Sequence, residues 1–437
     1  MDARIKFLRL GAAFVVTLSA SAQTLNTLYS FGHNELGYQP FAVTLGPNGD
    51  IFGTAPEGGA YGYGVAFELT PPQVPGGGWP YSVLHSFNPK NGEGQPSLDT
   101  AMAMGSSGVL YGVTSYDSAG GNGTVYRLFP VAASPSWRED TLLAFTGGNG
   151  EGPGGVGPDC TVFIGPSGVL YGTATAGGAN DVGVVFRLVP SSTQGGAWTE
   201  QVLYSFGGYA GDGTSPYGPL TVAQNQALFG VTQSGGAAPL GGTVFRLAPP
   251  ASADGDWTES VLHSFGTSAA DPGLPNGVVV GPNGELYGTA AQYLAGSCTA
   301  CGSVFKLVPP AAPGGAWSET ILHRFAGGNG NKDGSQPNSI PLIGPSGELY
   351  GTTYSGGAYG VGTIYRMVPP SSSEGAWAEE ILYSFTGGAD GAEPTGIAFG
   401  PDGNLYGSTE FGGVSPSGST NQGTIFQLVL PQNSSRR

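Results

Sequence analysis

Four acidic residues in glycine-rich segments are the side chains of this sequence most able to do chemistry: Asp212, Asp333, Asp390 and Glu393. Two carboxylates at a suitable separation hydrolyse a glycosidic bond, one as acid and one as base or nucleophile. Carboxylates also bind calcium, but calcium needs six or more oxygens, and each segment alone offers too few. Asp-Gly and Asn-Gly are typical of tight turns. We therefore expect turns and no cofactor, with calcium binding and catalysis as alternatives.

The cysteines and histidines give weaker signals. Cys298 and Cys301 form a lone Cys-x-x-Cys motif, whereas a closed zinc site needs four ligands and no further Cys or His lies nearby. Disulfides persist in oxidising compartments, so we expect a local disulfide here. His85, His263 and His323 occupy a position that carries tyrosine in sister segments, which indicates interchangeable strand side chains. We assign no catalytic residue.

These residues lie in a sequence that repeats itself. The tetrapeptide Leu-x-x-Phe occurs seven times, with successive copies 56 to 61 residues apart. The copies span residues 28–31, 84–87, 142–145, 203–206, 262–265, 322–325 and 382–385. A regular period of this size indicates an architecture built from one repeated supersecondary unit.

Each repeat contains four short apolar segments separated by Gly- and Pro-rich turns. In the sixth repeat these segments are residues 339–343, 349–353, 362–368 and 377–385. Gly-Pro-Ser-Gly at 344–347 is typical of a tight turn, and Pro369-Pro370 ends the third segment because proline cannot donate to a ladder. Four antiparallel strands per repeat predict the blade of a β-propeller.

The two ends of the chain are complementary. Residues 24–31 form a lone fourth-strand segment, and the last repeat stops after its third-strand segment, 423–428. The sequence therefore predicts an all-β, seven-bladed β-propeller of four-stranded antiparallel blades, closed by pairing of the N-terminal strand with the last blade. Such closure removes two open sheet edges. We expect one domain over residues 23–430 and a short polar tail over 431–437.

Large and charged residues recur in register. Six tryptophans open fourth segments, and we expect their rings to seal contacts between blades. They are Trp79, Trp137, Trp198, Trp257, Trp317 and Trp377. Basic residues of third segments and glutamates of fourth segments occur together, which predicts cross-strand pairs worth less than about 1 kcal/mol each. The predicted pairs are Arg127–Glu139, Arg187–Glu200, Arg246–Glu259, Lys306–Glu319 and Arg366–Glu379.

Residues 1–22 have the pattern of an export signal. Arg4, Lys6 and Arg9 precede an apolar run, and Ala20-Ser21-Ala22 offers a small-residue cleavage site. The apolar run is too short to span a bilayer. Without this segment the chain has 11 basic and 29 acidic residues, a net charge near −18 that disfavours nucleic acid and anionic lipid. We expect a secreted or periplasmic monomer without a membrane span.

Several short sequence motifs recur in the same order along residues 24–430. Typical copies are Leu-Tyr-Gly-Thr at 286–289, which follows Gly-Pro-Asn-Gly, and Gly-Thr-Val-Phe-Arg-Leu at 242–247. The pattern resembles the bacterial GloVer tandem-repeat (choice-of-anchor) proteins, whose repeats are taken to build β-propellers. The resemblance implies an exported protein, often with a C-terminal anchor, and residues 433–437 do not resemble one. It implies no activity and no catalytic residue.

Two functions are consistent with these features. Near-equivalent repeats with few reactive side chains favour an exported, non-catalytic scaffold. Its glycine-rich loops, expected on one face of the propeller, would bind a polysaccharide, a peptide or a partner protein. The alternative is an extracellular polysaccharide hydrolase or lyase that uses the loop carboxylates at the mouth of the channel. A serine triad is disfavoured because no Gly-x-Ser-x-Gly elbow precedes a helix.

Overall fold

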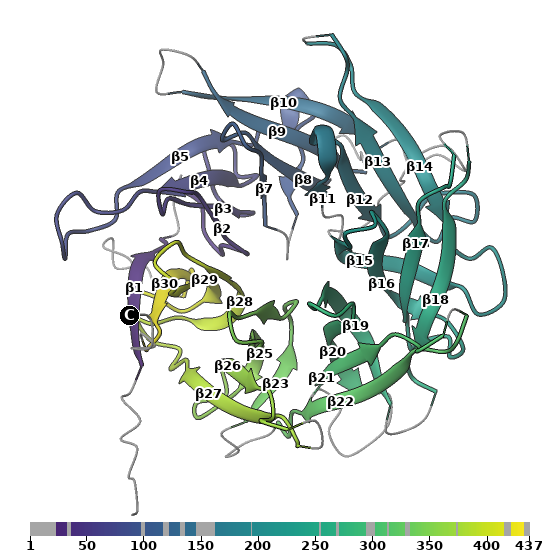
Figure 1. The fold of residues 1–437 in the computed structure, drawn as a ribbon. Helices are drawn as coiled ribbons and strands as arrows, with labels where there is room; N and C mark the ends of the chain where they lie inside the picture. The colour runs from purple at the N-terminus through teal and green to yellow at the C-terminus, as the bar shows by residue number, and fades with distance from the viewer. Residues whose placement is uncertain are drawn as a thin grey trace, which may run out of the picture.

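The strands form a ring of seven four-stranded antiparallel blades around a central axis (Figure 1). The prediction of a seven-bladed β-propeller is confirmed. This computed structural model describes residues 23–32, 36–97, 101–116, 122–131, 136–145, 162–193, 195–252, 255–267, 271–293, 302–312, 314–327, 333–372, 375–414 and 421–431. Cys298, Cys301 and the expected export signal lie outside the described residues. Within the described ranges, no helix has the length and apolarity needed to cross a bilayer.

The first four blades follow one another along the chain, each running from an innermost to an outermost strand. Blade 1 consists of β2 (Thr44–Leu45), β3 (Ile51–Ala55), β4 (Val65–Leu69) and β5 (Tyr81–Ser86). Blade 2 consists of β6 (Gln95–Pro96), β7 (Ala103–Met104), β8 (Leu110–Tyr116), β9 (Thr124–Pro130) and β10 (Trp137–Ala144). Blade 3 consists of β11 (Val162–Ile164), β12 (Leu170–Ala174), β13 (Val184–Val189) and β14 (Thr199–Ser205). Blade 4 consists of β15 (Gly213–Val222), β16 (Leu228–Gly235), β17 (Thr243–Ala248) and β18 (Thr258–Ser264).

The remaining blades complete the ring. Blade 5 consists of β19 (Pro272–Val280), β20 (Leu286–Tyr293), β21 (Ser303–Val308) and β22 (Ser318–Arg324). Blade 6 consists of β23 (Gly334–Pro337), β24 (Leu342–Ile343), β25 (Leu349–Gly356), β26 (Thr363–Val368) and β27 (Ala378–Ser384). Blade 7 consists of β28 (Ala392–Phe399), β29 (Leu405–Phe411), β30 (Thr424–Val429) and β1 (Thr24–Ser30). The part of the chain that the structure describes also contains two 3-10 turns, η1 (Pro89–Asn91) and η2 (Pro166–Gly168).

The chain closes its own ring. β1 pairs antiparallel with β30, from Thr24 opposite Val429 to Ser30 opposite Thr424, and Figure 1 shows the purple β1 beside the yellow β30. The last blade thus takes its outermost strand from the start of the chain, as the complementary ends predicted. Closure gives both terminal strands a partner that an open stack would lack.

The repeated phenylalanine of Leu-x-x-Phe ties each outermost strand to its blade. All seven of these phenylalanines are buried, and each backbone N–H donates to the carbonyl of the glycine that precedes the third strand, over 3.0 to 3.1 Å. The phenylalanines are Phe31, Phe87, Phe145, Phe206, Phe265, Phe325 and Phe385. The best-preserved sequence motif, Leu-x-x-Phe, therefore corresponds to one backbone hydrogen bond that recurs in every blade.

The hydrophobic core is divided among the blade interfaces. Among the described residues there are seven buried clusters, and each joins two neighbouring blades. The cluster between blades 7 and 1, with Ile425 and Phe67, resembles the others. The six tryptophans lie at the same interfaces, each against an aromatic ring of the preceding blade, with centroids 5.8 to 6.4 Å apart. Burial between blades is what holds the ring together.

The predicted Arg–Glu pairs are wrong by one residue. Arg366 lies opposite Glu380, whereas Glu379 lies opposite Met367 on the other face of the sheet. The same offset places Arg127 opposite Asp140 and the other basic residues opposite Gln201, Ser260 and Thr320. Each outermost strand carries a bulge at the leucine of its Leu-x-x-Phe motif, which shifts its register by one and determines which of its residues share a face with the basic residue of the third strand. The glutamates therefore point into the blade interfaces.

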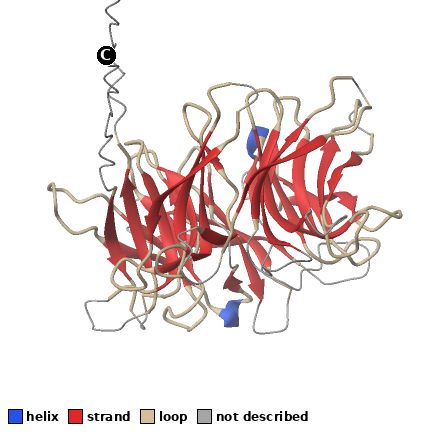
Figure 2. Ribbon diagram, turned by 90° about the horizontal axis from the view of Figure 1, so that it is seen from below, coloured by secondary structure: helices blue, strands red, loops and turns tan. Residues whose placement is uncertain are grey.

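Loops lie above and below the layer of strands (Figure 2). On one face, the loop between the second and third strands contacts the connection that joins neighbouring blades: Gly357 N donates to Asp333 O at 2.7 Å, and Gly413 N to Gly388 O at 2.8 Å. We call this side the glycine-rich face, as the sequence predicted. The Gly-Pro-x-Gly turns and the linkers before the outermost strands lie on the opposite face.

Candidate functional site

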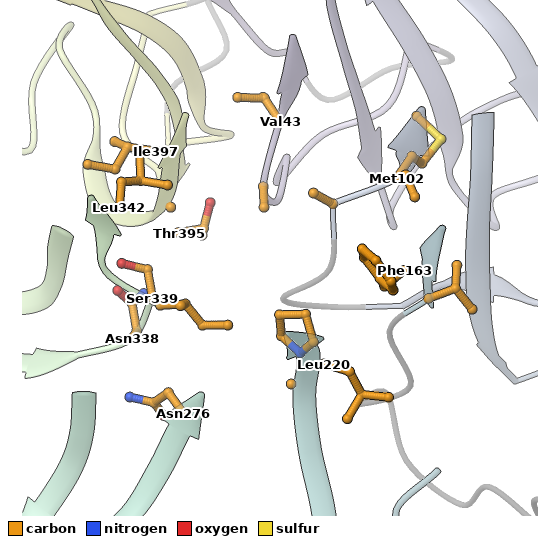
Figure 3. Close-up of a pocket in the computed structure, with 18 of the residues that line it drawn as sticks. Val43, Met102, Phe163, Leu220, Asn276, Asn338, Ser339, Leu342, Thr395 and Ile397 are labelled. Carbon is orange, nitrogen blue, oxygen red and sulfur yellow. The ribbon is translucent and has the colours of Figure 1, made fainter. Parts of the chain in front are cut away.

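A cavity of about 520 Å³ lies on the axis of the ring. Every blade lines it with its innermost segment, so the residues come from seven distant parts of the sequence (Figure 3). Val43, Met102, Phe163, Leu220 and Ile397 represent five of the blades and give the wall its apolar character. A cavity of this size is large enough for one or two side chains or a small ligand.

The few polar groups of the cavity wall are largely used between blades. Asn276 Nδ2 donates to Pro337 O at 2.6 Å, and Asn338 Nδ2 donates to Pro394 O at 2.8 Å, each across a blade interface. Thr395 Oγ1 lies 2.8 Å from Ser408 Oγ. None of the described residues that line the cavity carries a carboxylate, imidazole, thiol, amine or guanidinium. The described wall thus supplies no strong acid or base for catalysis.

The three predicted aspartates occupy equivalent places in three different blade interfaces, outside the cavity wall. Asp212 accepts hydrogen bonds from Tyr204 Oη at 2.8 Å and from Gly208 N at 3.0 Å. Asp390 accepts them from Tyr383 Oη at 3.0 Å and from a backbone N–H of its own turn. Asp333 accepts one from a backbone N–H at 2.7 Å. Each aspartate therefore shapes the connection in which it lies, in agreement with a turn role.

The fourth predicted residue, Glu393, meets two others on the glycine-rich face. Tyr354 on β25 donates to Glu410 Oε2 at 3.2 Å, and Glu393 lies within hydrogen-bonding reach of the same phenol. Burial, followed by the hydrogen bond to Glu393 and the charge of Glu410, raises the pKa of Tyr354. The phenol therefore stays protonated near neutral pH and acts as a donor between two carboxylates.

Glu393 also has an unusual backbone. Its φ of 57° is in the left-handed region, and it directly precedes Pro394. Its N–H donates to Val361 O of blade 6 at 2.8 Å. Ser215 and Leu274 repeat this geometry before Pro216 and Pro275 in other blades. The conformation recurs from blade to blade, so we read it as part of the joint between blades.

The glycine-rich face carries exposed apolar side chains at its loop tips. Tyr61, Leu240 and Tyr359 are more than half exposed, at 54, 68 and 63 %. Each occupies the loop between the second and third strands of its blade. Three further exposed apolar residues of this face are Leu36, Tyr209 and Val414. Glycines that flank these tips, such as Gly58, Gly235 and Gly356, have positive φ and hold the loops in tight turns.

The chain matches the Gloeobacter/Verrucomicrobia repeat family over residues 100–332 and 253–436. The two matches together cover more than half of the sequence. The chain belongs to this family. This match confirms the resemblance to the GloVer tandem-repeat proteins that the recurring sequence motifs indicated. No curated protein matches the chain.

Solved structures resemble this repeat protein in fold alone. One is a putative oxidoreductase (glucose dehydrogenase) from Thermus thermophilus, with 16 % identity, 93 % of this chain and 100 % of that chain covered, and a TM-score of 0.43. Another is a putative 6-phosphogluconolactonase from Bacteroides uniformis, with 15 % identity, coverage of 90 and 100 %, and a TM-score of 0.47. A third is a periplasmic gluconolactonase from Pseudomonas aeruginosa, with 14 % identity, coverage of 77 and 83 %, and a TM-score of 0.46. At these values the likeness says nothing about activity.

Sequence reasoning missed the residues that gather at the axis and at the loop tips. Met102, Phe163 and Leu220 lie in innermost segments whose sequences differ from blade to blade, so no shared motif predicts their position at the axis. The tips gave a usable signal, because Tyr61 and Tyr359 share the word Gly-Gly-Ala-Tyr-Gly. A large apolar residue within a glycine-rich turn has little to pack against, which predicts exposure.

Proposed function

We propose that this protein is an exported, non-catalytic binding scaffold that holds an extended peptide segment of a partner protein on its glycine-rich face. The observation that carries the proposal is the set of exposed apolar tips on that face, Tyr61, Leu240 and Tyr359 above all. Tyrosine is enriched in protein interfaces because it buries a large area and keeps a hydroxyl for hydrogen bonding. Scattered apolar residues are ordinary on a surface, but tips at equivalent places of several blades form a repeated motif.

The axial cavity supports the same function. Its wall is apolar, and it is large enough to bury one side chain of a bound segment that reaches the axis of the ring. Interfaces commonly obtain most of their affinity from a few such buried anchors. An uncharged anchor is expected, because the described wall offers no opposite charge to a Lys, Arg, Asp or Glu side chain.

A peptide fits these surfaces better than a polysaccharide. Tyr61 and Tyr359 would stack on a sugar as readily as on a peptide, but sugar recognition also relies on many hydrogen bonds. The amides of Asn276 and Asn338 already donate across blade interfaces. The six tryptophans pack at those interfaces as well, against rings of neighbouring blades. The hydrolase alternative has less support, since Asp212, Asp333 and Asp390 lie in three different blade interfaces, where each accepts hydrogen bonds from its own connection.

The test is a selection of random peptides displayed on phage against the purified protein. Enriched peptides are measured by fluorescence anisotropy with wild type and with the triple variant Tyr61→Asp, Leu240→Asp, Tyr359→Asp. We expect apolar, uncharged core motifs and a loss of affinity of about tenfold or more in the triple variant, because each buried apolar contact is worth about 1 kcal/mol or more.

Val74→Asp is the matched control, since Val74 is 64 % exposed but lies in a linker of the opposite face. It should leave the affinity of the selected peptides unchanged. Peptides that bind all three proteins equally, or a selection without enrichment, would overturn the proposal. Turnover of a polysaccharide that Asp212→Ala, Asp333→Ala or Asp390→Ala abolishes would replace it with the hydrolase.

A further inference from the structure

Two blade interfaces bring a histidine and two carboxylates together. We call them cluster A (His263, Asp271 and Glu319) and cluster B (His323, Asp333 and Glu379). In both, one donor atom of each residue lies within 4.8 Å of the donor atoms of the other two. The histidine comes from the outermost strand of one blade, the aspartate from the connection, and the glutamate from the outermost strand of the next blade. Strand β22 contributes Glu319 to cluster A and His323 to cluster B.

The spacing in cluster A suits donors around one ion. His263 Nε2 lies 3.8 Å from Glu319 Oε1 and 4.0 Å from Asp271 Oδ1, which is too long for a hydrogen bond. The centre of an equilateral triangle with sides of about 3.8 Å is about 2.2 Å from each corner, and zinc bonds to nitrogen and oxygen are about 2.0 to 2.2 Å long. Two of the three distances in cluster A are close to this side length, and all three donor atoms lie within 4.8 Å of one another.

The aspartates are oriented by bonds outside the clusters. Thr267 donates to Asp271 Oδ2 from its backbone N at 2.8 Å and from its Oγ1 at 2.7 Å, and Oδ1 is the oxygen near His263. In cluster B, Ala326 N donates to Asp333 Oδ2 at 2.7 Å, and Asp333 Oδ1 forms a long hydrogen bond of 3.4 Å with His323 Nε2, longer than the 2.8 Å bond of His85 to Glu93. Ligands held in this way lose little freedom when they bind an ion.

Cluster A contains buried polar atoms without hydrogen bonds. His263 Nε2 and Glu319 Oε1 are both shielded from solvent and have no hydrogen-bond partner, and Glu379 Oε1 of cluster B is in the same state. Burial of a polar atom without a partner costs free energy. A cation between these atoms would satisfy them.

We propose that clusters A and B each bind one divalent transition-metal ion of the zinc class. The ion would tie the outermost strands of two adjacent blades to the connection between them. An imidazole nitrogen with two carboxylate oxygens suits zinc, whereas calcium prefers six to eight oxygens. Three protein ligands leave a fourth position for water.

Two other interfaces of the ring provide internal comparisons. Between blades 3 and 4, Tyr204 occupies the place of the histidine, beside Asp212 and Glu259, and its protonated phenol is not a metal ligand. Between blades 1 and 2, His85 Nε2 lies 2.8 Å from Glu93 Oε2, a direct hydrogen bond. That oxygen also accepts a hydrogen bond from a backbone N–H at 2.7 Å, so both the imidazole and the carboxylate oxygen already have hydrogen-bond partners. We expect no ion at either place.

The experiment titrates Zn²⁺ into the full chain, freed of metal by a chelator, and follows binding by isothermal calorimetry. Co²⁺ replaces zinc in a parallel titration that reads visible absorption, which reports the ligand field. His263→Tyr and His323→Tyr introduce the residue that Tyr204 and Tyr383 supply in sister blades, so both variants should fold. His85→Tyr is the matched control.

We expect two zinc ions per chain for wild type and for His85→Tyr, one for each single variant, and none for the double variant. Zinc should raise the melting temperature of wild type and leave the double variant unchanged, because only ligands that bind the folded state stabilise it. Calcium in about 100-fold excess should not displace zinc. A stoichiometry that the His263 and His323 variants leave unaltered, or no zinc binding, would overturn the proposal.

Discussion

Tyr209 and Glu259 join two blades: Tyr209 Oη donates to Glu259 Oε2 over 2.8 Å. Tyr209 lies in the connection between blades 3 and 4, and Glu259 lies on β18, the outermost strand of blade 4. The second carboxylate oxygen of Glu259 is buried without a hydrogen bond. Burial raises the pKa of Glu259 to about 7, with a further contribution from the charge of Asp212, although the bond from Tyr209 acts in the opposite direction.

This arrangement predicts a pH dependence of stability. The unfolded chain releases the Glu259 proton near pH 4.5 and the folded protein near pH 7, so the free energy of unfolding falls as pH rises through this window. Glu259→Gln imitates the neutral carboxyl. It should stabilise the protein at pH 8 by on the order of 1–3 kcal/mol and have little effect at pH 4. Urea unfolding at both pH values measures this.

The control for Glu259→Gln is Glu380→Gln, since the side chain of Glu380 is 47 % exposed and ion-paired with Arg366. This variant should bring no gain at pH 8. An effect of Glu259→Gln that is equal at both pH values, or a loss at pH 8, would contradict the assignment.

Closure of the ring predicts a large cost for loss of Phe31. The ring of Phe31 is only 1 % exposed and packs 5.4 Å from the ring of Phe67, and its N–H donates to Gly423 O at 3.0 Å. Phe31→Ala should reduce the free energy of unfolding by about 3–5 kcal/mol. Asn26→Ala removes only an exposed 3.1 Å bond to Gln427 and should cost less than about 1 kcal/mol. Equal small losses in denaturant unfolding would mean that β1 does not close the ring.

Two adjacent acids on β10 should respond in opposite ways. Asp140 Oδ2 accepts from Arg127 Nη2 at 2.7 Å, whereas Glu139 points into the blade interface, where burial raises its pKa. Asp140→Asn should cost about 0.5–1 kcal/mol, because the pair is partly exposed. Glu139→Gln should be neutral or stabilising at pH 8. Thermal unfolding of the two variants checks the register, since a pairing of Arg127 with Glu139 would reverse the signs.

The fold could be predicted from the sequence because the best-preserved motif, Leu-x-x-Phe, corresponds to a backbone hydrogen bond that every blade makes. Phe31 and Phe385 stand at opposite ends of the chain, yet each donates to a glycine before a third strand, and this equivalence made closure predictable. The register of the outermost strands could not be predicted. A bulge at residues such as Leu382 shifts the pairing by one, and spacing alone carries no trace of it.

The candidate sites depend on contacts between blades, which made them harder to predict. His263 and Glu319 lie 56 residues apart, close to one repeat period, and residues separated by one period lie in neighbouring blades. The spacing of one repeat period could therefore have predicted from the sequence that His263 and Glu319 lie in neighbouring blades. The direction of each side chain could not be predicted, because the bulge in the outermost strand decides which of its residues face the interface. The axial cavity is lined by seven innermost segments, and these segments share no sequence motif that would have predicted it.

Tyr365 gives the last prediction. Its Oη is fully buried without a hydrogen bond, and the same position carries phenylalanine in five sister blades. Those phenylalanines are Phe67, Phe186, Phe245, Phe305 and Phe426. Tyr365→Phe removes the unsatisfied hydroxyl and keeps the ring, whose centroid lies 5.2 Å from that of Phe325. It should therefore stabilise the protein by about 1–2 kcal/mol.

Tyr383→Phe is the matched control for Tyr365→Phe, because Tyr383 Oη donates to Asp390 Oδ2 at 3.0 Å. Loss of that bond leaves a carboxylate oxygen with one donor fewer, so this variant should lose about 1 kcal/mol. Guanidinium unfolding of both variants measures the contrast. A loss of stability in Tyr365→Phe would mean that its hydroxyl has a bound partner in solution, since a buried hydroxyl that costs free energy to remove must be satisfied.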